Sequence, residues 1–281
     1  MRIRATVAAL SGTLALSALA VPAATAVDGP STPKLAVSVA KAAKVSNGAN
    51  AGDTKITKIT VNGGKDVVLG TTEKKKFTVA VTATDPEGIV AGSAFLWHGP
   101  DKDHADGVIS PDNFEGKCVV VNATTSTCTV TVVADPKVDL FSNDAAGGGW
   151  KAFATVGTGG MGEATVEGAK TDLRVQRAAR LTTNASPEPI KKGKTLTVTG
   201  ALTRANWETS KYAGYTKQDV KLQYKKKGAS SYTTLKTVKS DTKGNLKTTV
   251  KASADGYFRY VFAGTSTTPS VTSTADFVDV Q

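Results

Sequence analysis

The segment LWHGPDKDHADG, from Leu96 to Gly107, contains both histidines of the chain and three aspartates, Asp101, Asp103 and Asp106. These carboxylates could supply oxygen ligands to an extracellular Ca²⁺, which takes about 6 to 8 of them. The spacing departs from the D-x-D-x-D-G of an EF-hand loop, because Ala105 stands at the fifth position. Calcium binding by residues 99–107 is therefore one interpretation of this segment.

A transition-metal site would use His98 and His104 together with one of the aspartates. Six residues across the end of a strand do not fix two imidazoles toward one point, so the ligand set is incomplete. The simplest interpretation is a solvated acidic turn, in which Asp side chains accept backbone N–H groups. The sequence therefore predicts no cofactor, with Ca²⁺ as the alternative.

The chain has two cysteines, Cys118 and Cys128, on either side of VVVNATTST. In a secreted protein such an isolated pair is typical of a disulfide rather than of a metal or redox site. Two adjacent antiparallel strands, turning near Ala123, would place the two sulfur atoms opposite each other. The disulfide would then fix the strand register, since a slip of one residue reverses the face of every side chain.

Lysines alternate with apolar residues in DVKLQYKKK and NLKTTVKAS. The alternation predicts that the outward positions are Lys221, Lys225, Lys247 and Lys251. Such a stripe could bind an anionic cell-wall polymer, an acidic polysaccharide or extracellular DNA without sequence specificity. The alternative is that lysines on exposed strands maintain solubility and prevent pairing between sheet edges.

A long connection, RANWETSKYAGYTKQD, carries three aromatic residues, Trp207, Tyr212 and Tyr215. Loops at the end of a β-sandwich are common binding sites, and exposed rings can stack on sugars or cations. Aromatic rings in such a loop can also fold back over the end of their own core, because they bury a large apolar area.

Motifs of the common enzyme classes are absent from the sequence. There is no G-x-S-x-G and no H-E-x-x-H, and the GKT at residues 193–195 lacks the preceding glycine of a P-loop because Glu188 stands there. A non-catalytic protein is expected. A secreted hydrolase that uses acidic residues of the first half is the alternative, because the separation of two carboxylates is set only in three dimensions.

Residues 1–26 have the composition of a secretory signal peptide. Arg2 and Arg4 precede an apolar run of Ala, Leu and Val, which ends in the small residues of ATA at positions 24–26. A transmembrane helix needs about 20 mostly apolar residues, and Pro22 with several polar residues interrupts this run. The mature chain is expected to be secreted, with no membrane span.

Beyond residue 52 the dominant pattern is the period-two alternation of β-strands, broken by turn sequences such as NGG and DPEG. KFTVAVTAT and TCTVTVVA are examples in the first half, and seven further segments follow in the second. Many short strands separated by turns are typical of β-sandwiches. We expect an all-β chain of two tandem immunoglobulin-like β-sandwiches, at 53–178 and 179–281, after a flexible leader at 27–52.

Charge is divided unevenly between the two halves. Residues 178–281 carry 17 Lys and Arg against 7 Asp and Glu, whereas residues 27–177 carry 16 against 17. The basic character of the protein therefore belongs to its second half.

Two long segments resemble the C-terminal immunoglobulin-like module of a group of secreted actinobacterial two-domain proteins. They are SPEPIKKGKTLTVTGALTRANW and KLQYKKKGASSYTTLKTVKSDTKGNLKTTVKASADGYFRYVFAGTSTTPSV. The first half, with VNGGKDVVLGT, LWHG, the cysteine hairpin and GWKAF, resembles the N-terminal module of the same group. The resemblance implies the architecture and no established activity, although some members carry a calcium-binding label.

Together these patterns predict a secreted, non-catalytic protein that acts in binding, adhesion or structure at the cell envelope or in the extracellular matrix. The basic second half would attach to anionic surfaces, and the first half would carry any specific contact. Calcium binding and hydrolysis are the alternative functions.

Overall fold

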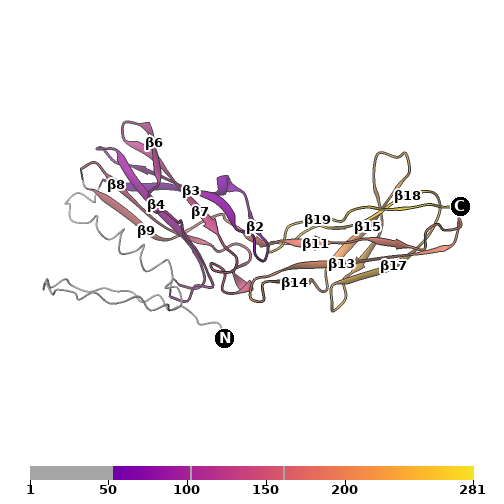
Figure 1. The fold of residues 1–281 in the computed structure, drawn as a ribbon. Helices are drawn as coiled ribbons and strands as arrows, with labels where there is room; N and C mark the ends of the chain where they lie inside the picture. Colours follow the sequence, from indigo (N-terminus) through magenta and orange to yellow (C-terminus); the bar gives the residue numbers. More distant parts are fainter. Residues whose placement is uncertain (1–52, 102, 161) are drawn as a thin grey trace, which may run out of the picture.

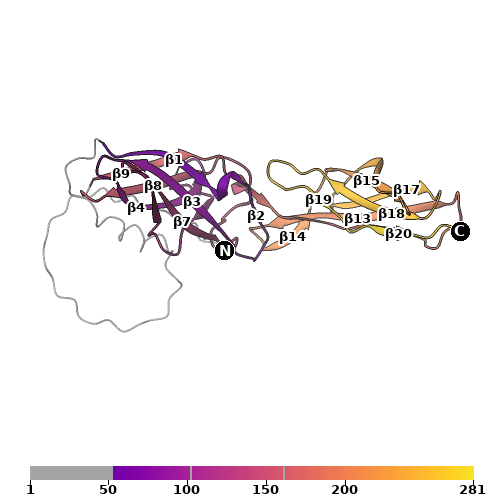
Figure 2. The same ribbon diagram turned by 90° about the horizontal axis from the view of Figure 1, so that it is seen from above.

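The computed structural model describes residues 53–281 except 102 and 161. The predicted signal peptide and leader lie outside the described residues. The described residues form β-strands and two short 3-10 helices, and include no α-helix. Two β-sandwiches lie end to end (Figures 1 and 2), so the predicted all-β architecture of two tandem immunoglobulin-like sandwiches is confirmed. Within the described ranges, no helix is long and apolar enough to cross a membrane.

The first sandwich consists of ten strands and two 3-10 helices. They are β1 (Lys55–Val61), η1 (Asn62–Gly64), β2 (Val67–Leu69), β3 (Lys75–Thr84), β4 (Ile89–His98), β5 (Gly107–Ile109), β6 (Lys117–Asn122), β7 (Thr125–Ala134), η2 (Asn143–Ala145), β8 (Lys151–Thr158), β9 (Glu163–Lys170) and β10 (Val175–Arg177). One sheet has the order β1-β3-β7-β6 and the other β5-β4-β8-β9. In chain order these are the A-B-E-D and C′-C-F-G sheets of an immunoglobulin-like sandwich.

Alternation of side chains builds the core of the first sandwich. The inward residues of β3 are fully or almost fully buried, and so are their counterparts on β8; they are Phe77, Val79, Val81, Ala83, Ala152, Ala154 and Val156. At the end of this core the Trp150 indole is fully buried and donates a hydrogen bond from Nε1 to the Ala145 carbonyl, at 3.0 Å. The period-two pattern of the sequence is thus the pattern of burial.

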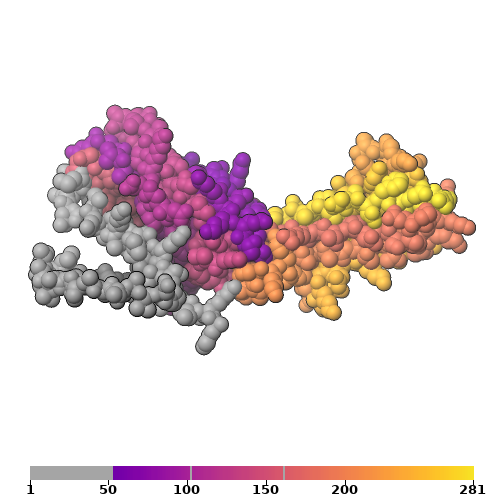
Figure 3. Space-filling model, viewed as in Figure 1, coloured from indigo at the N-terminus to yellow at the C-terminus, as the bar shows by residue number. Residues whose placement is uncertain are grey.

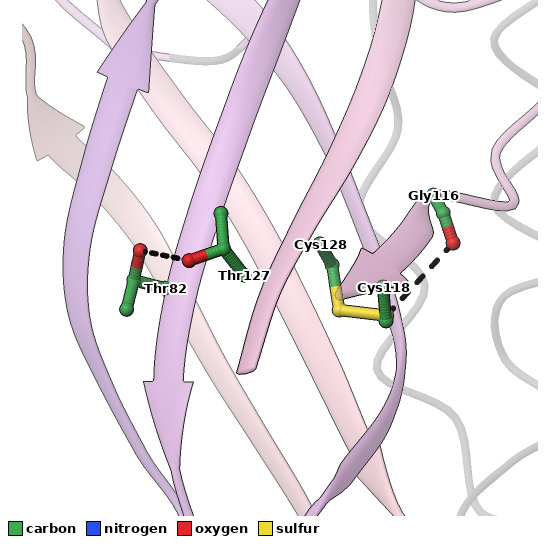
Figure 4. The surroundings of a disulfide bond; sticks show 5 residues. All are labelled: Thr82, Gly116, Cys118, Thr127 and Cys128. Atoms are coloured by element: carbon green, nitrogen blue, oxygen red, sulfur yellow. Dashed lines mark hydrogen bonds between the residues drawn. A yellow bond between two sulfur atoms is a disulfide. The ribbon is translucent and has the colours of Figure 1, made fainter. Parts of the chain in front are cut away.

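The disulfide joins Cys118 on β6 to Cys128 on β7. The two residues are direct partners in the antiparallel register, as the sequence predicts (Figure 4). β6 contributes no buried side chain, and residues 119, 120 and 121 are all exposed valines. A cross-link over a loop of this length stabilises the fold by about 3 kcal/mol in the loop-entropy account, so it holds an edge strand that the core holds only weakly.

The second sandwich has ten strands. They are β11 (Ala179–Leu181), β12 (Asn184–Ser186), β13 (Thr195–Asn206), β14 (Lys211–Gly214), β15 (Asp219–Lys226), β16 (Thr233–Lys239), β17 (Asn245–Lys251), β18 (Gly256–Phe262), β19 (Val271–Thr272) and β20 (Asp276–Val278). β13 pairs with β11, β12, β14 and β17, and the facing sheet runs β16-β15-β18, with β19 and β20 both paired to β18. Its core contains the buried aromatic rings of Phe258, Tyr260 and Phe262.

Trp207 joins the two sandwiches. It lies in the turn between β13 and β14, yet its fully buried side chain belongs to the same apolar cluster as the core of the first sandwich. The indole Nε1 donates a hydrogen bond to the Gly70 carbonyl, at 3.0 Å. In the space-filling view the orange residues of this turn abut the indigo and magenta surface of the first sandwich without a gap (Figure 3).

Polar contacts surround the buried indole. The Asn143 side chain of η2 accepts the backbone N–H of Trp207 and donates to the Asn206 side chain, at 3.0 and 3.1 Å. The Glu208 carboxylate accepts the backbone N–H of Asn143 at 3.0 Å and the Ser142 hydroxyl at 3.3 Å. These hydrogen bonds lower the pKa of Glu208. The turn of the second sandwich therefore caps the 3-10 helix of the first.

Arginines and aromatic rings complete this joint. Arg177 is buried and donates from Nε to the Ala205 carbonyl at 2.6 Å, and its burial, with the nearby charge of Arg204, lowers its pKa to about 10. The Arg204 guanidinium lies 3.9 Å from the ring centre of Tyr215, and that of Arg180 lies 3.6 Å from the ring centre of Tyr212. Cation–π contacts of this kind hold the half-buried Arg204 and the exposed Arg180 over their rings.

Replacement of Trp207 by alanine should separate the two sandwiches. Loss of a buried tryptophan costs about 3 to 5 kcal/mol, and here the cost falls on the contact between the sandwiches. We expect calorimetry of Trp207→Ala to show two unfolding transitions where the parent protein shows one. Tyr232→Ala, a partly exposed ring remote from the joint, should retain a single transition. A single transition at the parent temperature in Trp207→Ala would contradict this account of the joint.

Candidate binding surfaces

Asp101 forms a closed polar turn with His104. One Asp101 carboxylate oxygen accepts the backbone N–H groups of Asp103 and His104, both at 2.9 Å, and lies 2.8 Å from His104 Nδ1. The side-chain hydrogen bond from His104 is the main cause of the lowered pKa of Asp101. This carboxylate is therefore engaged within its own turn, as in the acidic-turn interpretation of the sequence.

Asp106 has a different partner, His98 at the end of β4. Asp106 Oδ1 lies 2.6 Å from His98 Nδ1, and His98 Nε2 lies 3.1 Å from the Gly148 carbonyl oxygen. The imidazole is thus held between two acceptors, and the hydrogen bond to Asp106 is the main cause of its raised pKa. The pair connects the loop after β4 to the glycine-rich segment before Trp150.

The three aspartates of this loop share no partner that would bring their carboxylates together. Asp101 and Asp106 each contact a different histidine, and one oxygen of Asp103 is enclosed without a hydrogen-bond partner. In residues 53–281, apart from the two positions left undescribed, no group of three or more His, Cys, Asp or Glu is arranged to hold a metal ion. Calcium binding by this loop stays a prediction.

The four lysines predicted to form one stripe lie on two sheets, which corrects the sequence interpretation. Lys221 and Lys225 are on β15, whereas Lys247 and Lys251 are on β17 in the facing sheet. Alternation places each residue inward or outward but does not say which strands share a sheet. The lysines point outward, but on the two outer faces of the sandwich.

Lys236 lies where the edges of these two sheets meet. It is in register with the buried Leu222 of β15, and its Nζ donates to the Thr249 carbonyl of β17 at 2.6 Å. A lysine that reaches across a sheet edge in this way prevents edge-to-edge pairing. Edge protection, one part of the alternative interpretation of the lysines, therefore applies to this residue.

Aromatic and cationic side chains lie together on the outer face of the β16-β15-β18-β20 sheet. Lys225, Tyr257 and Phe277 are register partners across three adjacent strands. Tyr232 precedes β16, and Arg259 lies one row further along β18. We call this set the aromatic–cation face. It comprises Lys225, Tyr232, Tyr257, Arg259 and Phe277.

Contacts within the aromatic–cation face fix its cations. The Arg259 guanidinium lies 3.6 Å from the ring centre of Tyr232, and its Nε donates to Gln223 at 2.9 Å. Lys225 Nζ lies 5.2 Å from the ring centres of both Tyr232 and Tyr257. Among the described residues, neither Lys225 nor Arg259 forms a salt bridge. Their positive charges are therefore positioned by rings and not neutralised by carboxylates.

Sequence reasoning missed three rings and the arginine of this face. The signal was present in GYFRYVF, where alternation places Tyr257 and Arg259 outward once the buried partners Phe258 and Tyr260 are recognised. The sequence does not show that β15, β18 and β20 are neighbours in one sheet. Without this knowledge, the partners of Lys225 could not be named.

Trp207 and Tyr212 of the long connection belong to the joint, whereas Tyr215 lies in the core of the second sandwich. Trp207 is fully buried and Tyr215 is 9% exposed, while the partly exposed Tyr212 packs against the same cluster as Trp207. This corrects the expectation of exposed rings that stack on a ligand. The rings do fold over a core, but the core that receives Trp207 is that of the other sandwich.

No family model matches this chain, and no curated protein matches it. Solved structures with a similar arrangement of strands include a marsupial T cell receptor, with 14% identity, a TM-score of 0.42 and coverage of 80% of this chain and 72% of that one. Fibronectin(III)-like modules of Clostridium thermocellum CbhA show 10% identity, a TM-score of 0.31 and coverage of 79% and 93%. The amphioxus IgVJ-C2 molecule shows 10% identity, a TM-score of 0.28 and coverage of 75% and 98%. The strand order described above, and not these distant likenesses, defines the fold class.

The pair of His98 and Asp106 makes stability depend on pH. Because the folded protein raises the pKa of His98, the stabilisation is complete below the unfolded pKa of about 6.5 and is lost as the pH rises through the folded pKa. We expect thermal unfolding between pH 5 and pH 8 to show this loss, and Asp106→Asn to remove most of it. Asp101→Asn should leave it intact, since Asp101 titrates below this range. An unchanged pH dependence in Asp106→Asn would refute the assignment.

Proposed function

We propose that the protein is a secreted, non-catalytic binding or structural protein of the cell envelope or extracellular matrix, whose second sandwich attaches to anionic polymers. The observation that carries this proposal is the division of charge between two joined sandwiches, with a net charge of +10 on residues 178–281. A basic surface attracts polyanions through its summed field, and the attraction is screened by salt.

The joint supports this division of roles. Side chains connect the sandwiches as well as the chain itself: Trp207, the capping of η2 by Glu208 and the hydrogen bond from Arg177 to the Ala205 carbonyl. Attachment of the second sandwich to a surface would therefore hold the first sandwich at a set distance and orientation. An immunoglobulin-like pair arranged in this way suits a binding or structural role.

The extracellular location is supported by the disulfide, because disulfides persist in oxidising compartments. The predicted signal peptide points to the same compartment. Calcium binding and hydrolysis stay alternatives from the sequence, and neither has a specific contact among the described residues in its favour.

Retention of the mature protein on immobilised polygalacturonate tests the proposal. We expect binding at about 50 mM NaCl, steep loss toward about 500 mM as screening shortens the range of the charges, and no binding to neutral dextran. Chelator should change nothing, and no new reducing ends should appear during incubation. Absence of retention at low salt would overturn polyanion binding, whereas release by chelator or the appearance of reducing ends would favour one of the alternatives.

A further inference from the structure

We propose that the aromatic–cation face is the binding site for an acidic polysaccharide, recognised through its carboxylate groups. This inference rests on the proposed attachment to anionic polymers and assigns it to one face of the second sandwich. The face spans three strands, with Phe277, Tyr257 and Lys225 in one row and Arg259 in the next.

The face presents positive charge in a fixed pattern. Tyr232 lies under Arg259, and Lys225 lies between the rings of Tyr232 and Tyr257. Free lysine and arginine side chains lose much rotamer entropy when they bind an anion. Here the rings have already restricted both side chains, so an anion that arrives meets a preorganised pair of cations.

The spacing of the face fits a linear polymer. Rows on one strand recur about every 7 Å and adjacent strands lie about 4.8 Å apart. Beyond Gln223, the outward Lys221 continues the β15 column and is free of salt bridges among the described residues. Positive charges at these spacings could engage successive acidic groups along one extended polysaccharide chain.

The chemistry of the face favours a carboxylated sugar over a nucleic acid. The guanidinium of Arg259 presents a planar fork that matches a carboxylate, and the hydroxyl of Tyr257 suits a sugar hydroxyl. Base stacking needs open ring faces. Arg259 covers a face of Tyr232, and Tyr257 packs against Phe277 with centroids 5.1 Å apart.

The lysines on the other outer face of this sandwich lack such contacts with aromatic rings. Lys247 and Lys251 are exposed on β17, and Lys251 donates to the Thr195 hydroxyl at 3.0 Å. No aromatic ring of the described chain is in cation–π contact with either of them. They provide a control that carries the same charge without the rings.

Binding of polygalacturonate to the mature protein at fixed salt tests the assignment with two variants of equal net charge. Lys225→Gln with Arg259→Gln should weaken binding about tenfold or more, as expected for loss of charge-assisted contacts. Lys247→Gln with Lys251→Gln should weaken it by no more than about twofold, through the general field alone. Tyr232→Ala, which changes no charge, should also weaken binding several-fold, and Tyr232→Phe should retain the affinity; thermal unfolding of each variant confirms that it is folded.

The outcomes separate this assignment from the proposed function. Equal weakening by the two charge-matched pairs would overturn the assignment and leave general polyanion attachment in place. Failure of the unaltered protein to bind at low salt would overturn both. Tighter binding of single-stranded DNA than of polygalacturonate at the same salt would show that the partner class is wrong.

Discussion

The burial of Trp207 at the end of the first sandwich is the interaction on which the arrangement of the molecule depends. Trp207 enters the apolar cluster of the first sandwich together with the smaller Ala205, and the Gly70 carbonyl accepts its indole N–H. Because a buried polar group without a partner is costly, the indole fits in one orientation. The hydrogen bonds from the Trp207 backbone to Asn143 and from the Asn143 backbone to Glu208 then follow from where that turn must lie.

Because the joint is fixed, each face of the second sandwich points in a set direction relative to the first sandwich. The charge of this sandwich is spread over both outer faces and over the edge that Lys236 bridges. On the β15–β18–β20 face, away from the joint, aromatic rings hold Lys225 and Arg259 in place. General attraction to anionic surfaces and recognition by one face are therefore different properties of the same sandwich, one arising from total charge and the other from geometry.

Much of the fold could be predicted from the sequence, because alternation sets which side chains are buried. The alternation of KFTVAVTAT puts Phe77, Val79 and Val81 on one face of a strand, and that face is buried; the register of Cys118 with Cys128 follows from the hairpin. The candidate sites could not be predicted as well. Alternation does not identify neighbouring strands, so the lysines were assigned to one surface when they occupy two. Nor does it say which core a loop tryptophan enters, and Trp207 enters that of the other sandwich.

Backbone ¹⁵N relaxation of the mature protein is the most direct test of the fixed joint. A rigid connection requires both sandwiches to report one common, anisotropic rotational diffusion tensor, with the slow tumbling of the whole elongated molecule. The amides of Arg177 and Ala178 should show the same low mobility as the neighbouring strands, since they donate across the joint to the carbonyls of Thr267 and Leu69. Separate and faster tumbling of the two sandwiches, with mobile amides between them, would contradict the account.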